Sequence, residues 1–268
     1  MREQMYQQIR PAIQSFAEVV TPAMQEVSDA ILQLTPIAEK VGRVAEFMRR
    51  WVPNWSNGVD PDRAWDVTVE GIPLAFVPRA RIVDQLIAAE NRDARLDIVL
   101  SSKSLILSDC RDALDVEDDD PLPESLATLP ALLREVVDVL EAGYVASACA
   151  LGISVIDAAL RRTSEKKINY SNVRTAVVAK KLRKAIAEND FRVSRAMRPL
   201  HSLCVNWDPR SQEPLPPMPS RGAIAHWAEP GHLSETNAIL IAMAATSLLL
   251  GLAEREVVAR LVEDGSRR

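Results

Sequence analysis

Apolar side chains recur every three or four positions along the first part of the chain. This spacing places them on one face of an amphipathic helix, and the positions concerned are Ile9, Ile13, Phe16, Val20, Met24, Val27, Ile31 and Leu34. Three prolines interrupt the pattern, and each removes a backbone N–H donor: Pro11, Pro22 and Pro36. Kinks, or a division into shorter helices, are therefore expected. We predict an N-terminal helical arm over residues 1–57 and a protein partner that binds through it.

A second part of the chain, residues 58–120, contains only short apolar segments. Residues 65–69 and 71–78 are apolar runs bounded by turn residues, and residues 81–100 are typical of a small helical unit. A short two-stranded element is the alternative for the first two segments. We predict a small helical region between the arm and the remaining chain.

A run of acidic residues closes this second part. It comprises Asp112, Asp115, Glu117, Asp118, Asp119 and Asp120, and it leads into Pro121 and Pro123. One interpretation is a magnesium site, but consecutive aspartates on one short segment splay apart and repel, whereas magnesium gathers its carboxylates from separate elements. We therefore interpret the run as a solvated linker.

The third part, residues 121–268, has two long apolar stretches. Residues 126–162 are apolar nearly all round, which predicts a helix that is buried on most sides. Residues 238–253 form an apolar run of about 16 residues, shorter than the roughly 20 residues that a membrane span requires. Charged residues follow this run directly, at positions 254–256. We expect a helix buried in a domain core or a dimer interface, and no membrane role.

The composition favours a protein built from helices. With 268 residues, 47% of them hydrophobic and 26% charged, the chain is long enough for one large or two ordinary domains with a packed core. Aromatic residues make up only 4% of the chain and there are 9 glycines, while Ala, Leu and Val recur at helical spacing, so an all-α fold is predicted.

The cysteines and the N-terminus indicate where the protein works. Cys110, Cys149 and Cys204 are odd in number and widely spaced, so they predict neither a disulfide framework nor a zinc site and fit a reducing compartment. The N-terminus shows no apolar segment followed by a small-residue cleavage site, so no secretory signal is expected. We predict a cytoplasmic protein.

Charge is distributed unevenly along the third part. Residues 161–198 contain twelve Lys and Arg against three Asp and Glu, in a protein whose formal net charge is −5. Such a basic segment predicts binding to nucleic-acid phosphates, and the alternative is a solvated face that pairs with the acidic linker. Aromatic residues are not interleaved in it, which argues against base-specific reading of single strands by this segment. The candidate substrate-binding residues are Lys180, Lys181, Arg183, Lys184, Arg195 and His201.

Candidate chemistry centres on Arg221 and His226, in the pattern Arg-x4-His. Five positions separate their side chains by about 140° in an ideal helix. Pro219 before the pair and the break at residues 229–231 after it favour a short, distorted turn that would bring the two closer. We interpret the third histidine, His232, as an exposed loop residue.

A second pair, Arg195 and His201, has a similar spacing, Arg-x5-His, and Arg198 lies one turn from His201. We rank this pair lower because Pro199 divides its segment and a long proline-rich loop follows it.

The surroundings of Arg221 and His226 resemble a known family. The pair is followed by a loop and then by a long apolar helix beginning at Ser234, and a helix over residues 141–157 precedes it. This arrangement resembles HEPN domains, whose hallmark is Arg-x4-6-His, and the resemblance covers roughly residues 125–268. HEPN proteins often carry a polar residue directly after the arginine, where this chain has Gly222.

The resemblance implies a helical bundle and a metal-independent endoribonuclease with a toxin or phage-defence role. By the same resemblance, Arg221 and His226 would be the catalytic residues of a site that two subunits of a homodimer share. By resemblance Asp157 would orient the motif arginine. From the sequence around it we interpret Asp157 instead as a surface residue or as a core carboxylate held by a partner.

RNA cleavage without metal needs a base, an acid and a cation, and a histidine and an arginine have those properties. The chain lacks Gly-x-Gly-x-x-Gly, Walker, His-Glu-x-x-His and Gly-x-Ser-x-Gly motifs, and we expect no cofactor. The alternatives are a catalytically inactive HEPN-like binding or assembly module and a helical structural protein.

Overall fold

The computed structural model describes residues 52–56, 58–115, 122–162, 195–203, 205, 207–210 and 213–266, with side chains described as far as Glu254. The chain divides into two compact units, one of Trp51–Arg260 and one of Met1–Arg50 with Leu261–Arg268. The contacts between described side chains lie within the unit Trp51–Arg260. Residues 1–51 and 57 of the predicted N-terminal arm, the acidic residues at positions 116–120, and Lys180, Lys181, Arg183 and Lys184 lie outside the described residues.

Every regular element in the described part of the chain is a helix, so the all-α prediction is confirmed there. The two-stranded alternative is wrong, because residues 71–78 form buried irregular backbone and no strand. The elements are α3 (Pro61–Val69), α4 (Ala80–Ala88), α5 (Arg92–Ser101), α6 (Lys103–Leu114), α7 (Leu129–Glu141), α8 (Val145–Arg162), α12 (Leu200–Leu203), the π-helix η1 (Gly222–His226), the 3-10 helix η2 (Pro230–His232) and α13 (Glu235–Ser266).

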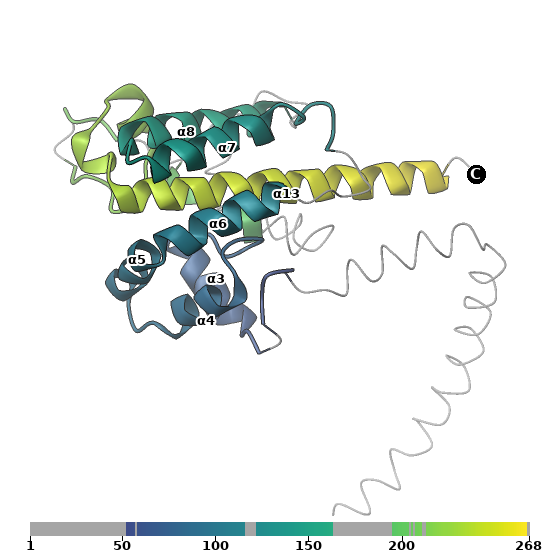
Figure 1. Ribbon diagram of the computed structural model, residues 1–268, viewed down its shortest axis with the longest axis horizontal. Coiled ribbons are helices and arrows are strands. Elements are labelled where there is room, and N and C mark those ends of the chain that lie inside the picture. Colours follow the sequence, from purple (N-terminus) through teal and green to yellow (C-terminus); the bar gives the residue numbers. More distant parts are fainter. Residues whose placement is uncertain are drawn as a thin grey trace, which may run out of the picture. The chain divides into compact units, whose positions relative to one another are not determined.

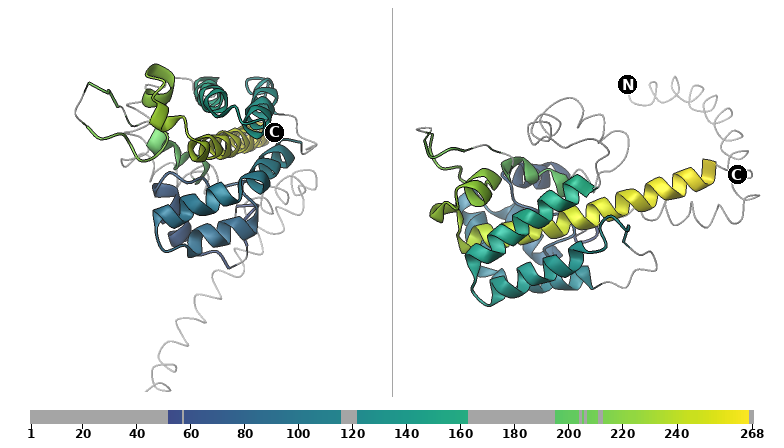
Figure 2. Two further views of the ribbon diagram at one scale, coloured as in Figure 1. Left: turned by 60° about the vertical axis from the view of Figure 1, so that its left-hand side comes forward. Right: turned by 90° about the horizontal axis from the view of Figure 1, so that it is seen from above.

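Helix α13 is the central element of this unit. It runs between the pair α7 and α8 on one side and α6 with its neighbouring helices on the other (Figures 1 and 2). Its side chains from Ala238 to Ala245 are at most 3% exposed, and Leu248 and Leu249 are fully buried. The predicted burial of the C-terminal apolar helix is therefore confirmed over its described side chains. Ser247 Oγ donates a hydrogen bond of 2.6 Å to the carbonyl of Ala75 and ties the irregular segment to this helix.

The residues Glu235–Glu254 of α13 are long and apolar enough to cross a membrane by length and composition alone, within the part of the chain that the structure describes. The same stretch is 78% buried inside the protein. Apolar side chains on all sides of a helix are expected when neighbouring helices cover it, and α13 has such neighbours on both sides.

The apolar stretch over residues 126–162 forms two helices, α7 and α8, rather than the single helix expected there. The chain turns at Gly143, whose φ of 85° lies in the left-handed region that glycine adopts without a steric penalty. The N–H groups of Gly143 and Tyr144 then donate to the carbonyls of Leu140 and Val139 and close the end of α7. As a result α8 packs back along α7 and presents its second half to the segment that carries Arg221.

The helical unit expected over residues 81–100 is also divided. Helix α4 ends at Ala88, and Asn91 begins α5 by accepting a hydrogen bond of 3.0 Å from the N–H of Ala94. Asparagine is a preferred residue at this position because its side chain satisfies an N–H group that the first helical turn leaves without a partner.

Candidate functional site

A π-helical turn brings Arg221 and His226 together. Residues Gly222–His226 form η1, and Arg221 stands directly before it. Hydrogen bonds in a π-helix join residues five positions apart, so residues at this spacing lie on the same side of the turn. Arg221 Nη1 is 3.4 Å from His226 Nε2, a long contact for a hydrogen bond. The expected distorted turn is therefore present.

Asp157 of α8 holds the arginine from the other side. Its carboxylate oxygens each lie 3.1 Å from Nε of Arg221. Arg161, one turn later on the same helix, has a guanidinium nitrogen 4.0 Å from the same carboxylate. The side chains of Arg221 and Asp157 are only 23% and 20% exposed, and partial burial strengthens an ion pair relative to one in open water. Asp157 is therefore a partly buried carboxylate that is held by Arg221 as its partner.

Ser220 fixes the start of the turn through four hydrogen bonds. Its N–H donates to Nδ1 of His232 over 3.1 Å, and its hydroxyl donates to the carbonyl of Val205 over 2.9 Å. The same hydroxyl oxygen accepts from the N–H of Ala223, and the Ser220 carbonyl accepts from the N–H of Ile224. Ser220 is fully buried, so these bonds replace the water that its polar groups lack.

The interpretation of His232 as an exposed loop residue is wrong. Its side chain is buried, with 1% exposed, and each ring nitrogen has a partner. Nδ1 accepts from the N–H of Ser220, so Nε2 carries the proton and donates to the carbonyl of Pro216 over 2.8 Å. His232 therefore joins Ser220 to Pro216 and holds in place the segment that leads to Arg221.

Ser220→Ala is expected to lower the free energy of unfolding by about 1–3 kcal/mol, because it leaves the partly buried carbonyl of Val205 without its donor. Urea denaturation followed by circular dichroism measures this. Ser154→Ala is the matched control: Ser154 Oγ also donates to a carbonyl, that of Ala150, but on the exposed face of α8 where water can replace it. Equal losses in the two variants would contradict the role assigned to Ser220.

The second candidate pair, Arg195 and His201, is placed elsewhere. Arg195 is 6% exposed, and its guanidinium carbon lies 4.7 Å from the centre of the Trp65 ring. Removal from water lowers the pKa of Arg195 to about 10, and the nearby charge of Asp62 opposes this shift. A guanidinium stacked against a ring inside the protein has a packing role there, and this position does not offer it to a phosphate.

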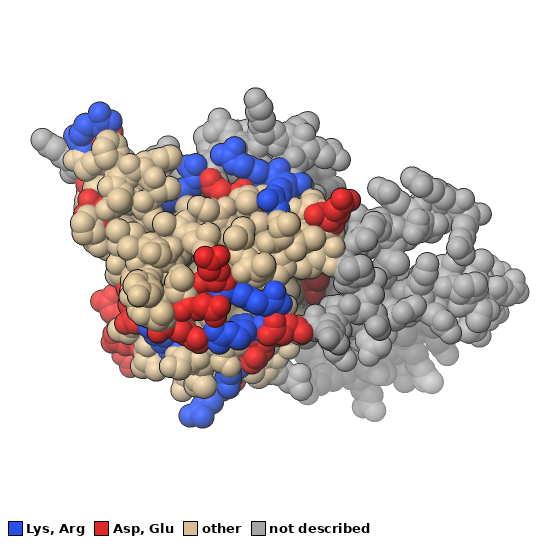
Figure 3. All heavy atoms as spheres, turned by 45° about the horizontal axis from the view of Figure 1, so that its top comes forward, with Lys and Arg blue, Asp and Glu red and all other residues tan. Residues whose placement is uncertain are grey.

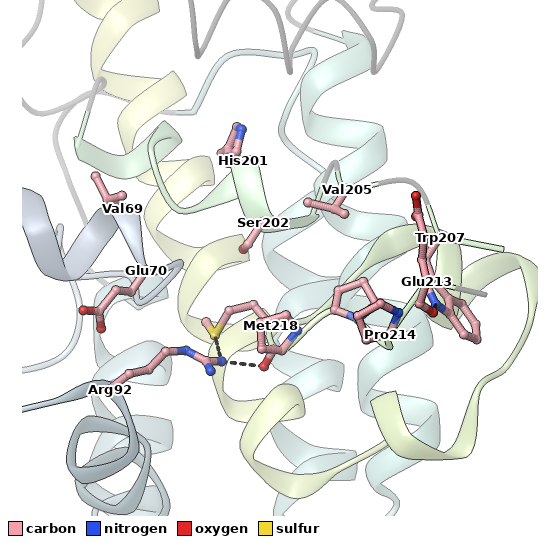
Figure 4. A pocket seen from close by; sticks show the side chains of 12 residues that line it. Val69, Glu70, Arg92, His201, Ser202, Val205, Trp207, Glu213, Pro214 and Met218 are labelled. Carbon is pink, nitrogen blue, oxygen red and sulfur yellow. Dashed lines mark hydrogen bonds between the residues drawn. The ribbon is translucent and has the colours of Figure 1, made fainter. Parts of the chain in front are cut away.

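His201 lines a cavity of about 470 Å³ behind the segment that leads to η1 (Figure 4). Arg92 and Glu70 lie at one end of the cavity, and Trp207 lies at the other. Arg92 Nη2 donates to the carbonyl of Pro217 and contacts the sulfur of Met218, which ties this wall to α5. Neither Arg221 nor His226 lines this cavity. The cavity is therefore separate from the candidate site formed by these two residues.

Acidic and basic side chains alternate on the face drawn in Figure 3. On α6 and α7, Arg111 contacts Asp138 and Glu141 at 2.8 and 2.9 Å, and Arg134 contacts Asp115 at 2.8 Å. Exposed pairs of this kind contribute little stability and leave little net field. The part of the basic segment described near the motif is Arg161, which is 61% exposed, and Arg162, which donates to the carbonyl of Ser125 and the hydroxyl of Thr128.

Among the described residues, no three His, Cys, Asp or Glu side chains gather as metal ligands. The two described cysteines, Cys110 and Cys149, are buried as free thiols, and burial raises the pKa of each to about 12. A thiol in this state is a poor nucleophile, so both residues serve the core.

Comparison of the chain with protein-family models, with curated proteins and with solved structures finds no match.

Proposed function

We propose that the protein is a metal-independent endoribonuclease of the HEPN type in which Arg221 and His226 act on one phosphate. The observation that carries the proposal is the π-helical turn, which places Arg221 Nη1 3.4 Å from His226 Nε2 while Asp157 holds Nε of the arginine. A guanidinium can only donate, so in this contact Nε2 of His226 presents a lone pair. A neutral imidazole in this form is able to accept a proton as a general base.

Each group has a defined role in cleavage. His226 takes the proton from a ribose 2′-hydroxyl, and the 2′-oxygen forms a bond to the adjacent phosphorus as the bond from phosphorus to the 5′-oxygen breaks. An acid then protonates the leaving 5′-oxygen. The products are a 2′,3′-cyclic phosphate and a 5′-hydroxyl. The fixed positive charge of Arg221 stabilises the negative charge that builds on the phosphoryl oxygens.

One histidine cannot easily be both base and acid in the same step. A homodimer would solve this, because His226 of the partner subunit would protonate the leaving oxygen while the first copy accepts the 2′ proton. The exposure of His226 supports this arrangement, since an imidazole at the surface is accessible to both RNA and a second copy. The resemblance extends the proposal to a toxin or phage-defence role.

The test is incubation of the purified full-length protein with single-stranded RNA in excess EDTA. We expect fragments that end in 2′,3′-cyclic phosphate, no fragments with His226→Ala, and no cleavage after a nucleotide whose ribose is replaced by deoxyribose. Cleavage that EDTA stops, or equal cleavage by His226→Ala, would contradict the proposal.

The alternative is a catalytically inactive HEPN-like binding or assembly module. The ion pair between Arg221 and Asp157 favours it, because this contact joins η1 to α8 and has a structural use of its own. Intact RNA after incubation with the wild-type protein, together with loss of folding in Arg221→Ala, would make this alternative the better account.

A further inference from the structure

Trp227 follows His226 directly and exposes its indole ring. The side chain is 40% exposed, and Ala225, His226 and Ala228 beside it are exposed as well. An indole has a large flat apolar face and is enriched where proteins bind partners. An accessible aromatic ring therefore follows the candidate general base directly in the chain.

Arg210 lies against this indole, with its guanidinium carbon 5.2 Å from the ring centre. The guanidinium is itself held by Asp208, through Nε to Oδ1 at 2.9 Å and Nη2 to Oδ2 at 2.7 Å. The N–H of Arg210 also donates to Oδ1 of Asp208 over 2.9 Å. Two parallel contacts fix the plane of a guanidinium, so Arg210 orients the ring of Trp227 even though both side chains stand at the surface.

The backbone after Trp227 is strained. Ala228 has a φ of 45°, in the left-handed region that residues with a Cβ atom rarely adopt. The N–H of Glu229 donates to the carbonyl of Ala223 over 2.9 Å and closes the turn. Strain of this kind persists only where the surrounding structure enforces it, and it gathers at functional sites. Here it occurs directly after the exposed indole.

We propose that Trp227, held by Arg210, is a stacking site for one nucleobase of single-stranded RNA. The inference rests on the proposed function, because the base would belong to a nucleotide adjacent to the phosphate bound by Arg221 and His226. Unpaired bases stack on aromatic rings and on guanidinium planes, and this contact accepts any base because every base has a flat π-face. In a duplex those faces are covered by neighbouring bases, so the site selects single strands.

The experiment measures binding apart from cleavage. The probe is an RNA oligonucleotide whose 2′-hydroxyls are all replaced by fluorine, which removes the nucleophile, and binding is followed by fluorescence anisotropy with the full-length protein. Trp227→Ala should weaken binding roughly 5- to 150-fold, the range measured for loss of one stacked base. Trp227→Phe keeps a ring and should retain most of the affinity. Tyr144→Ala is the matched control, because Tyr144 is an exposed aromatic residue directly before α8, and its loss should leave affinity unchanged.

An abasic scan of the same oligonucleotide identifies the stacked base. One abasic position should weaken binding to the wild-type protein as much as Trp227→Ala does, and should cost the Trp227→Ala variant nothing further. Equal binding by wild type and Trp227→Ala, fully additive losses, an equal loss in Tyr144→Ala, or undetectable binding by the wild type would each overturn the stacking site. Cleavage of natural RNA by the wild-type protein tests the proposed function separately, so either idea can fail alone.

Discussion

Arg221→Ala and His226→Ala are each expected to slow RNA cleavage by about three orders of magnitude, the usual effect of losing a general base or a fixed charge at the reacting phosphate. The double variant should be scarcely slower than either single one, because groups that act in one step are not additive. Single-turnover cleavage of a labelled RNA measures these rates. Rates within about tenfold of wild type in both single variants would refute the catalytic roles.

Gly222→Ala is the control from within the turn itself. A Cβ at Gly222 would lie 3.6 Å from Ser220 Oγ and from the backbone of Trp207, which is ordinary van der Waals contact. The substitution therefore changes η1 without displacing either functional side chain. We expect cleavage within a few-fold of wild type, and a loss as large as that of His226→Ala would mean that the turn tolerates no change at all.

A catalytic effect of Arg221→Ala must be separated from a structural one. This substitution leaves the carboxylate of Asp157, which is only 20% exposed, without its main partner, and an unpaired, partly buried charge is destabilising. The double variant Arg221→Ala with Asp157→Asn removes both charges. It should recover stability in urea denaturation while cleavage stays as slow as in Arg221→Ala. Recovery of cleavage along with stability would show that the arginine serves folding alone.

The helical class could be predicted from the sequence because it follows from pattern and composition summed over long segments. The division of residues 126–162 could not, since their apolar pattern continues through the turn, and only the left-handed φ of Gly143 reveals the break. The apolar segment at residues 71–78 allowed a strand as an alternative, and the structure has none there. It is buried like a strand, but Asn54 and Trp55 bond to the carbonyl of Leu74, where a neighbouring strand would otherwise bond.

The candidate site was predictable only in part. The spacing of Arg221 and His226, with proline before and after, was enough to indicate a distorted turn. The sequence could not identify Asp157 as the partner of Arg221, because the two residues are far apart in the chain. A lone carboxylate on an apolar helix is equally compatible with a surface position or with a core ion pair. His232 carried no signal at all: its burial depends on the N–H of Ser220 and the carbonyl of Pro216 meeting its two ring nitrogens.

The packing of α8 on α13 sets where Asp157 stands, and Gly152 is the closest point of that packing. A Cβ built on Gly152 would lie 2.5 Å from Cγ2 of Ile241, closer than real Cβ contacts occur. Ile241 is fully buried, and a close-packed core leaves its side chain little room to move. The two helices therefore approach each other at a position where only hydrogen fits.

Gly152→Val is therefore expected to lower the free energy of unfolding by about 3 kcal/mol, at the upper end of the usual cost of overpacking. Ala150→Val is the matched control, because it places the same branched side chain on the exposed face of the same helix and should cost only about 0.5 kcal/mol through helix propensity. Adding Ile241→Ala to Gly152→Val removes the clashing methyl group, so the double variant should be more stable than the sum of the two single losses predicts. Chemical denaturation compares the four variants, Ile241→Ala included, with the wild type. Asp157 lies on α8 five positions after Gly152, so a displaced helix should also slow RNA cleavage in Gly152→Val. Equal stability of Gly152→Val and Ala150→Val would show that the helices do not meet at this glycine.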